Sequence, residues 1–228
     1  MTNSAASPLP LLDARLTAIA DAVPSCRLAA DIGADHGRLS CWLLASARCE
    51  AMIVSDISEV SRQKAWQLLT RYHVADRVHL SGEDGLFALR EAVDAVIISG
   101  MGGRAIVRML AQEVDLAGAT LILGAHSKRM ELRKAVIKRE YAIKSERITL
   151  SDGRFYSVMT AVPGKQIMTE KEMMVGYNLF SSQPDTLRGY LVWQLSVAGK
   201  WRGAQGDQYR EWLREEIQHF ESNRTDDL

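Results

Sequence analysis

Carboxylates lie at the end of the first apolar run of the chain, in a loop that contains two glycines. The segment 28–37 reads Leu-Ala-Ala-Asp-Ile-Gly-Ala-Asp-His-Gly, which places acids at Asp31 and Asp35. A buried parallel strand that ends in a ligand-binding loop has this pattern. Pyrophosphate favours backbone N–H groups without nearby carboxylates, so a cationic ligand suits this loop better. The sulfonium and ammonium groups of S-adenosylmethionine make it the expected ligand; an NAD site is the alternative, but its G-x-G-x-x-G spacing is missing.

Three further apolar runs end in residues that could bind a nucleoside. Asp56 follows the second run, about where a carboxylate accepts both ribose hydroxyls in dinucleotide-binding folds. Glu83 and Asp84 follow the third run and suit the exocyclic amine of adenine. The glycines of segment 99–103 follow the fourth run and allow a ligand to approach the backbone closely. Ordinary turn and helix-cap roles are the alternative for these acids.

Two sets of candidate residues follow from these strand ends. The predicted cofactor-binding residues are Asp31, Ile32, Gly33, Asp35, His36, Gly37, Asp56, Ile57, Glu83, Asp84, Gly85, Gly100 and Met101. The residues predicted to shape the catalytic pocket are Gly100, Met101, Gly102, Gly103 and His126. His126 follows the fifth apolar run and could position a base, although an ordinary polar loop residue is the alternative. No cysteine is placed to act as a nucleophile, and no spacing indicates a metal site.

The elements that must position these residues alternate between strand and helix. Apolar runs predict strands over 28–32, 51–55, 78–80, 93–99 and 120–123, and helical spacing predicts helices over 9–22, 38–47, 58–73, 104–112 and 128–140. Two more strands, 141–149 and 154–162, flank a Ser-Asp-Gly turn as a hairpin. We therefore expect an α/β fold with a doubly wound, Rossmann-like sheet and a terminal antiparallel hairpin.

The chain divides into two predicted domains. Residues 1–164 form the α/β domain, and residues 165–228 form a small C-terminal α-helical domain. In the second domain, apolar residues recur at helical spacing, which predicts a helical hairpin joined near 203–206. Its tryptophans favour core packing between helices over the alternative of stacking on bases.

Composition is that of an ordinary soluble globular protein. The 228 residues are 47% hydrophobic and 25% charged, with a formal net charge of zero. Three cysteines without a C-x-x-C pair favour the reducing cytoplasm. The N-terminus lacks the features of a signal peptide, and no apolar run approaches the roughly 20 residues of a membrane span. We expect no membrane partner and no metal.

Positive charge is concentrated in the middle of the chain. Residues 101–165 carry 12 Lys and Arg against 6 Asp and Glu, whereas the segments on either side are net acidic. Such a segment is typical of a nucleic-acid footprint, although a solvated helix face is the alternative. Arg129, Arg133 and Lys134 follow the fifth predicted strand, so we expect them to contact RNA phosphates near the site.

Several of these segments together resemble the bacterial tRNA (adenine-22-N1)-methyltransferase family. The resemblance is carried by Ala30-Asp-Ile-Gly-Ala-Asp-His-Gly37, Asp84-Gly85-Leu86, Ile98-Ser-Gly-Met-Gly-Gly103, Leu121-Ile-Leu123 and Arg15-Leu16. It implies a class I S-adenosylmethionine-dependent methyltransferase domain with a C-terminal coiled-coil-like extension. The implied activity is methylation of N1 of an adenine in tRNA, and Arg15 joins the residues expected to bind that substrate.

The sequence departs from the family pattern at two places near the expected site. Gly124-Ala125-His126 stands where the family commonly has Gln-Pro-Asn, and Gly37-Arg38-Leu39-Ser40 replaces Ala-Tyr-Leu-Pro. A methyltransferase of another RNA or of a small molecule is therefore one alternative, and a non-catalytic RNA-binding module is another. We expect a cytoplasmic protein that acts on tRNA as a monomer or a weak homodimer.

Overall fold

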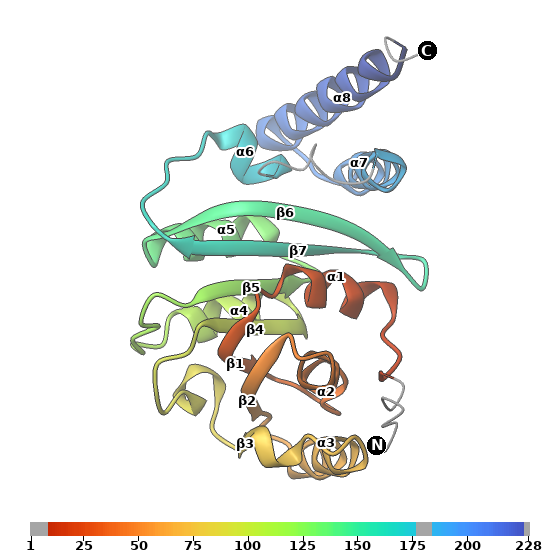
Figure 1. The fold of residues 1–228 in the computed structure, drawn as a ribbon. Coiled ribbons are helices and arrows are strands. Elements are labelled where there is room, and N and C mark those ends of the chain that lie inside the picture. The colour runs from red at the N-terminus through yellow and green to blue at the C-terminus, as the bar shows by residue number, and fades with distance from the viewer. Residues whose placement is uncertain (1–8, 177–183, 226–228) are drawn as a thin grey trace.

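A seven-stranded sheet forms the centre of the molecule (Figure 1). The computed structural model describes residues 9–176 and 184–225. The strands are β1 (Cys26–Ile32), β2 (Cys49–Ser55), β3 (Val78–Ser81), β4 (Ala95–Met101), β5 (Thr120–Ala125), β6 (Tyr141–Ser151) and β7 (Arg154–Pro163). The helices are α1 (Ala14–Ala22), α2 (Arg38–Ala45), α3 (Glu59–Arg71), α4 (Gly103–Leu110), α5 (Arg129–Lys138), α6 (Glu170–Val175), α7 (Pro184–Ala198) and α8 (Ala204–Thr225), with 3₁₀ turns η1 (Ala75–Arg77) and η2 (Gly85–Ala88).

The strand order is β3-β2-β1-β4-β5-β7-β6, which confirms the doubly wound sheet with a terminal hairpin. The first five strands pair in parallel, and β7 is antiparallel to both β5 and β6. The order reverses between β1 and β4, because β2 and β3 extend to one side and β5 to the other. Ligands bind at such a switch point in open α/β sheets.

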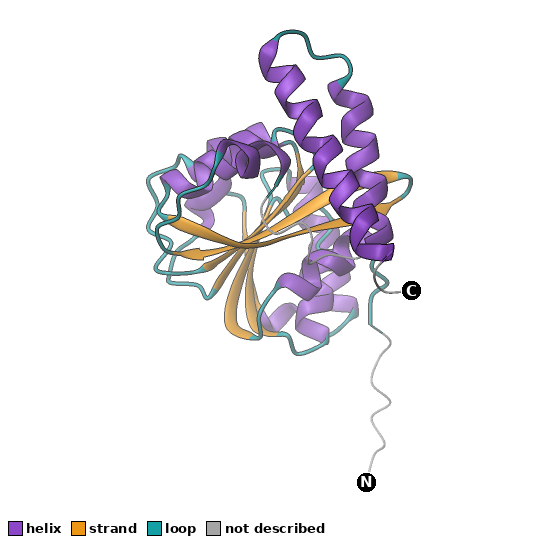
Figure 2. Cartoon of the chain, turned by 90° about the horizontal axis from the view of Figure 1, so that it is seen from above, coloured by secondary structure: helices purple, strands orange, loops and turns teal. Residues whose placement is uncertain are grey.

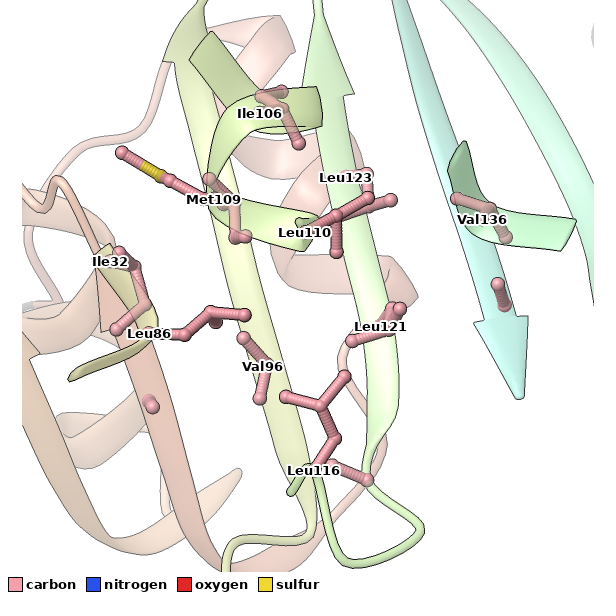
Figure 3. Close-up of a cluster of buried hydrophobic side chains, with 14 of the residues drawn as sticks. Ile32, Leu86, Val96, Ile106, Met109, Leu110, Leu116, Leu121, Leu123 and Val136 are labelled. Atoms are coloured by element: carbon pink, nitrogen blue, oxygen red, sulfur yellow. The ribbon is translucent and has the colours of Figure 1, made fainter. Parts of the chain in front are cut away.

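Helices cover both faces of the sheet, as Figure 2 shows from above. The central strands are therefore apolar on both sides: in β4, Val96 and Ile98 belong to one buried cluster, and Ala95 and Ile97 belong to the other. The first cluster includes residues of η2, α4 and α5, and Figure 3 shows part of it. The second cluster includes residues of α1, α2 and α3. These two layers hold the strand ends in fixed positions.

Some boundaries differ from the sequence prediction for identifiable reasons. Helix α1 begins at Ala14 rather than near residue 9, because the Asp13 side chain accepts a hydrogen bond from the Leu16 backbone at 2.8 Å and caps the helix. Strand β4 continues to Met101, through a register irregularity between Ser99 and Met101. The glycine segment expected after the strand thus lies partly within it.

The C-terminal helices pack on the hairpin edge of the sheet (Figure 1). A third buried cluster joins Ile148 of β6 with residues of α6, α7 and α8. The connection between α7 and α8 spans 199–203, slightly before the predicted joint, and α8 starts after Gly203, whose φ is +86°. Among the described residues, no helix is both long and apolar enough to cross a membrane.

Candidate functional site

A cavity of about 430 Å³ lies at the carboxyl ends of the first four strands. Its lining residues are Arg15, Leu16, Asp31, Ile32, Gly33, Ala34, Asp35, His36, Arg38, Leu39, Ser55, Asp56, Ile57, Glu83, Asp84, Gly85, Ser99, Gly100, Met101, Arg108 and Met109. This volume falls within the range of small-molecule sites, about 300–1,000 Å³. Every predicted cofactor-binding residue except Gly37 lines this cavity. Residues that lie up to 70 positions apart in the sequence therefore meet around the same cavity.

Gly37 has a packing role instead. It caps the N-terminus of α2 with a φ of +67°, and a Cβ added there would lie 2.8 Å from the Cβ of Ala65 in α3. The glycine therefore lets α2 and α3 approach each other behind the cavity. Backbone geometry explains its place in the loop motif, and its contact with the cofactor stays a prediction.

Asp31 is the buried acid of the cavity. Its side chain accepts a hydrogen bond from the Ser40 hydroxyl at 2.6 Å, and the residue is 3% exposed. Burial raises the pKa of Asp31 to about 6, although the Ser40 hydrogen bond lowers it in part and the nearby Asp56 raises it further. At pH 7 the group is mainly a carboxylate with poor solvation, which favours a ligand that brings positive charge.

Asp56 is held by the backbone around it. One carboxylate oxygen accepts from the backbone N–H of Asp35 at 3.0 Å, and the other accepts from that of Ser58 at 2.9 Å. These bonds fit the turn role that the sequence left open, and they orient the carboxylate at the cavity. Each oxygen can accept more than one hydrogen bond, so the group can also receive ribose hydroxyls.

The loop after β3 is fixed by a residue that sequence reasoning missed. The Gln112 side chain accepts from the Leu86 backbone at 2.7 Å and donates to the Asp84 carbonyl at 3.1 Å. Gly85 has a φ of +62°, and a Cβ there would lie 2.6 Å from the Gln112 amide oxygen. Glu83 and Asp84 are exposed at the cavity rim, and the Glu83 carboxylate also forms an ion pair with Arg90 at 2.8 Å.

The glycine segment after Ser99 divides into two parts. Gly100 and Met101 line the cavity, and a Cβ added at Gly33 would lie 2.6 Å from the Met101 methyl carbon. Met101 therefore packs directly on the first loop. Gly102 and Gly103 lie outside the cavity lining. A Cβ at Gly103 would come within 2.2 Å of the Ser127 carbonyl oxygen, so this glycine lets the loop after β5 pack against α4.

His126 lies in that loop and contacts Tyr156. The two ring centroids are 6.1 Å apart in an edge-to-face arrangement, and the Arg15 guanidinium carbon is 5.6 Å from the centre of the Tyr156 ring. Desolvation lowers the pKa of His126, and the charges of Arg15, Arg129 and Arg154 lower it further. The imidazole is therefore mainly neutral at pH 7. Sequence reasoning missed Tyr156. The predicted strand 154–162 contains this residue, but alternation along a strand does not say which side chains it contacts.

The three basic residues expected to bind phosphate differ in exposure. Lys134 is exposed, and the Arg129 guanidinium lies over the rings of Tyr190, at 5.2 Å, and Trp193, at 5.9 Å. Arg133 is 1% exposed and forms two hydrogen bonds with the Glu146 carboxylate, at 2.6 and 2.7 Å. The prediction that Arg133 contacts RNA phosphate is inconsistent with this burial, because its guanidinium already holds a carboxylate inside the protein.

Known proteins resemble this chain both in sequence and in fold. A family model for a methyltransferase domain matches residues 12–159. The tRNA (adenine(22)-N(1))-methyltransferase of Bacillus subtilis (strain 168) is 30% identical over 156 residues, which cover 67% of this chain and 66% of that protein. The match thus spans just under two thirds of that relative.

Solved structures show the same fold over most of the chain. The B. subtilis M1A22 tRNA methyltransferase TrmK has a TM-score of 0.74 and 23% identity, covering 93% of this chain and 98% of its own. Streptococcus pneumoniae Sp1610 in complex with S-adenosyl-L-methionine has a TM-score of 0.76 and 21% identity, covering 93% and 99%. Because the domain match covers more than half of the residues and includes the cavity loops, the chain belongs to the methyltransferase-domain family.

Proposed function

We propose that the protein is an S-adenosylmethionine-dependent methyltransferase that methylates N1 of an adenine in tRNA, with adenine-22 as the expected position. The convergence of carboxylates from three strand ends on one cavity carries this proposal. The names of the relatives, a tRNA (adenine(22)-N(1))-methyltransferase and a structure holding S-adenosyl-L-methionine, support it. A methyltransferase of another RNA is the second candidate, because Gly124-Ala125-His126 departs from the family pattern beside the cavity.

The residues of the cavity fit the charge of this cofactor. Asp31 suits its positively charged amino-acid part, Asp56 suits the ribose hydroxyls, and Glu83 with Asp84 suits the adenine amine. When bound, S-adenosylmethionine supplies an electrophilic methyl group. The N1 lone pair of adenine needs no strong base, so the protein contributes mainly by aligning the base and excluding water. Gly100 and Met101 form the cavity wall beside which the base is aligned with the methyl group.

In this function the two parts of the chain have different roles. Residues 1–164 act as the catalytic domain, and residues 165–228 act as a helical domain that extends the RNA-binding surface. The exposed Lys134 and the half-buried Arg129 contact tRNA phosphates. The buried Arg133 does not belong to this surface. The protein works in the cytoplasm, as a monomer or a weak homodimer, without a metal.

Nucleoside analysis of tRNA after incubation with the protein tests this function. A transcript with adenine at position 22 should gain one 1-methyladenosine, and the same transcript with guanine there should gain none. The Asp56→Ala variant should bind S-adenosylhomocysteine at least about tenfold more weakly in calorimetry, because it loses hydrogen bonds to a charged group. A wild type that binds the cofactor product but leaves the adenine-22 transcript unmethylated would favour the second candidate, and failure of the wild type to bind the cofactor product would reject both.

A further inference from the structure

Three side chains from separate elements meet beside the cavity. Arg15 comes from α1, His126 follows β5, and Tyr156 comes from β7. The Arg15 guanidinium carbon is 5.6 Å from the centre of the Tyr156 ring, and the His126 ring is 6.1 Å from it at 67°. The Tyr156 ring is therefore the common contact of the other two side chains.

This cluster adjoins the cavity wall formed by the end of β4. Arg15 lines the cavity, and one of its guanidinium nitrogens would lie 3.3 Å from a Cβ built on Gly100. Ala125 pairs with Met101 of β4 on one side and with Ser157 of β7 on the other. His126 follows Ala125, and Tyr156 precedes Ser157 in the antiparallel strand. Both therefore lie one position beyond this set of paired residues, next to Met101 in the cavity wall.

The cluster has the chemistry to hold an unpaired base. Aromatic rings and guanidinium planes are the surfaces on which proteins stack bases that have left an RNA helix. Neither residue is in the cavity lining, but the Tyr156 side chain is half-buried and His126 is exposed, so a ligand can contact both beside the cavity. Desolvation lowers the pKa of His126, and the charges of Arg15, Arg129 and Arg154 lower it further, so its imidazole is mainly neutral at pH 7. A neutral imidazole presents one nitrogen as a hydrogen-bond acceptor, which suits an exocyclic amine.

Charge also separates this cluster from the cofactor loops. The cavity lining is net acidic, with five carboxylates against the three arginines Arg15, Arg38 and Arg108, whereas the charges that act on His126 come from Arg15, Arg129 and Arg154. A cationic nucleoside and an anionic polynucleotide would each be drawn to its own side of the wall at Gly100. The boundary between the two sides is where a base from the polymer would meet the methyl donor.

We propose that Arg15, His126 and Tyr156 form the subsite for the target base, a purine with an exocyclic amine. Tyr156 is the further substrate-binding residue: its ring holds the Arg15 and His126 side chains and presents an aromatic surface to the base. This inference rests on the proposed function and names the residues that select its substrate.

Replacement of Tyr156 separates base binding from cofactor binding. Tyr156→Leu should lower the single-turnover methylation rate of an adenine-22 transcript at least about tenfold, the scale of one lost stacking contact. Its affinity for S-adenosylhomocysteine in calorimetry should stay within about twofold of wild type. Tyr156→Phe, which keeps the ring, should stay within about threefold in both measurements. Tyr72→Leu, at a half-buried tyrosine after α3 and outside the cavity lining, is the matched control and should retain the wild-type rate.

The outcomes distinguish this inference from the proposed function. An active wild type together with a fully active Tyr156→Leu variant would reject the subsite alone. A Tyr156→Leu variant that loses cofactor-product binding as strongly as methylation would also reject it, because the residue would then act through the fold. A wild type that binds the cofactor product but methylates no adenine in tRNA would reject the proposed function and the subsite with it.

Discussion

At the scale of single residues, Asp31 is the buried acid of the cavity, with 3% of its surface exposed. Burial raises its pKa to about 6, and the Ser40 hydroxyl is its hydrogen-bond donor at 2.6 Å. An acid whose pKa is higher in the folded protein than in the unfolded chain binds its proton more tightly when folded. Its ionisation therefore reduces stability as pH rises from about 4 to about 6, and above that range the penalty is constant.

Asp31→Asn should reveal both the cost of this buried charge to stability and its contribution to cofactor binding. At pH 7.5 we expect the ligand-free variant to be more stable in urea denaturation, by up to about 3 kcal/mol, because no charge is left to desolvate. The wild type should bind S-adenosylmethionine more weakly at pH 5.5 than at pH 7.5, since the proton competes with the ligand for Asp31. Calorimetry of the variant should show weaker binding at pH 7.5 and no such change with pH.

The control for Asp31 is Asp76→Asn, at an exposed acid outside the cavity lining. This variant should keep both the stability and the pH dependence of the wild type. Equal affinity of wild type and Asp31→Asn for the ligand at pH 7.5 would show that the buried carboxylate does not contact the cofactor.

At the scale of elements, a buried ion pair connects α5 to the hairpin and to α6. Arg133 of α5 bonds both oxygens of Glu146 in β6, and it donates a third hydrogen bond to the Met173 carbonyl at 2.6 Å. Because α5 begins just after the loop that carries His126, this pair ties the position of the C-terminal helices to the site loop. Its role is structural, which explains a strongly basic residue inside the protein.

Breaking this pair on one side should be far more costly than replacing both partners. Glu146→Gln leaves the Arg133 charge buried without its carboxylate, so urea denaturation should show a loss of about 3–5 kcal/mol. The double variant Arg133→Met with Glu146→Leu should lose much less, because no charge remains buried. Arg188→Gln, which breaks a half-exposed pair with Glu221, is the control and should lose less than about 1 kcal/mol. A double variant as unstable as Glu146→Gln would contradict this account.

At the scale of the whole molecule, zero net charge hides a division into acidic and basic regions. The cavity carries carboxylates at the ends of the first three strands, and residues 101–165 carry twice as many basic as acidic residues. Lys134 and Arg154 are exposed in this segment. The division allows one protein to attract a cationic cofactor and a polyanion at the same time.

The affinity for tRNA should therefore depend on salt while the affinity for the cofactor does not. Raising NaCl from 50 to 200 mM should weaken tRNA binding at least about tenfold in a filter-binding assay, because condensed ions are released from contacted phosphates. Lys134→Gln should reduce the slope of log affinity against log salt by about one, whereas Lys165→Gln, at an exposed lysine two residues beyond the end of β7, should not. A tRNA affinity that is constant over this salt range would show that the basic segment is only a solvated surface.

The positions of the cavity acids were determined by the sequence by itself. Asp31, Asp56 and Asp84 each follow an apolar run, and parallel strands bring their carboxyl ends to one edge of a sheet. The doubly wound sheet and the convergence of these residues could therefore be predicted from local periodicity and the rules of α/β topology, whereas the order of the strands came only from the structure. Element ends were predicted less well, because a cap such as Asp13 is decided by one side-chain hydrogen bond.

The tertiary structure alone decided which polar residues serve the site and which serve the fold. Arg133 had the spacing of a phosphate contact, but its partner Glu146 lies on another element and buries it. Tyr156 and Gln112 had no local signal, because their contacts with Arg15 and Asp84 join segments far apart in the chain. Periodicity reports which face of an element is apolar, whereas the partner of a polar side chain depends on which elements pack side by side.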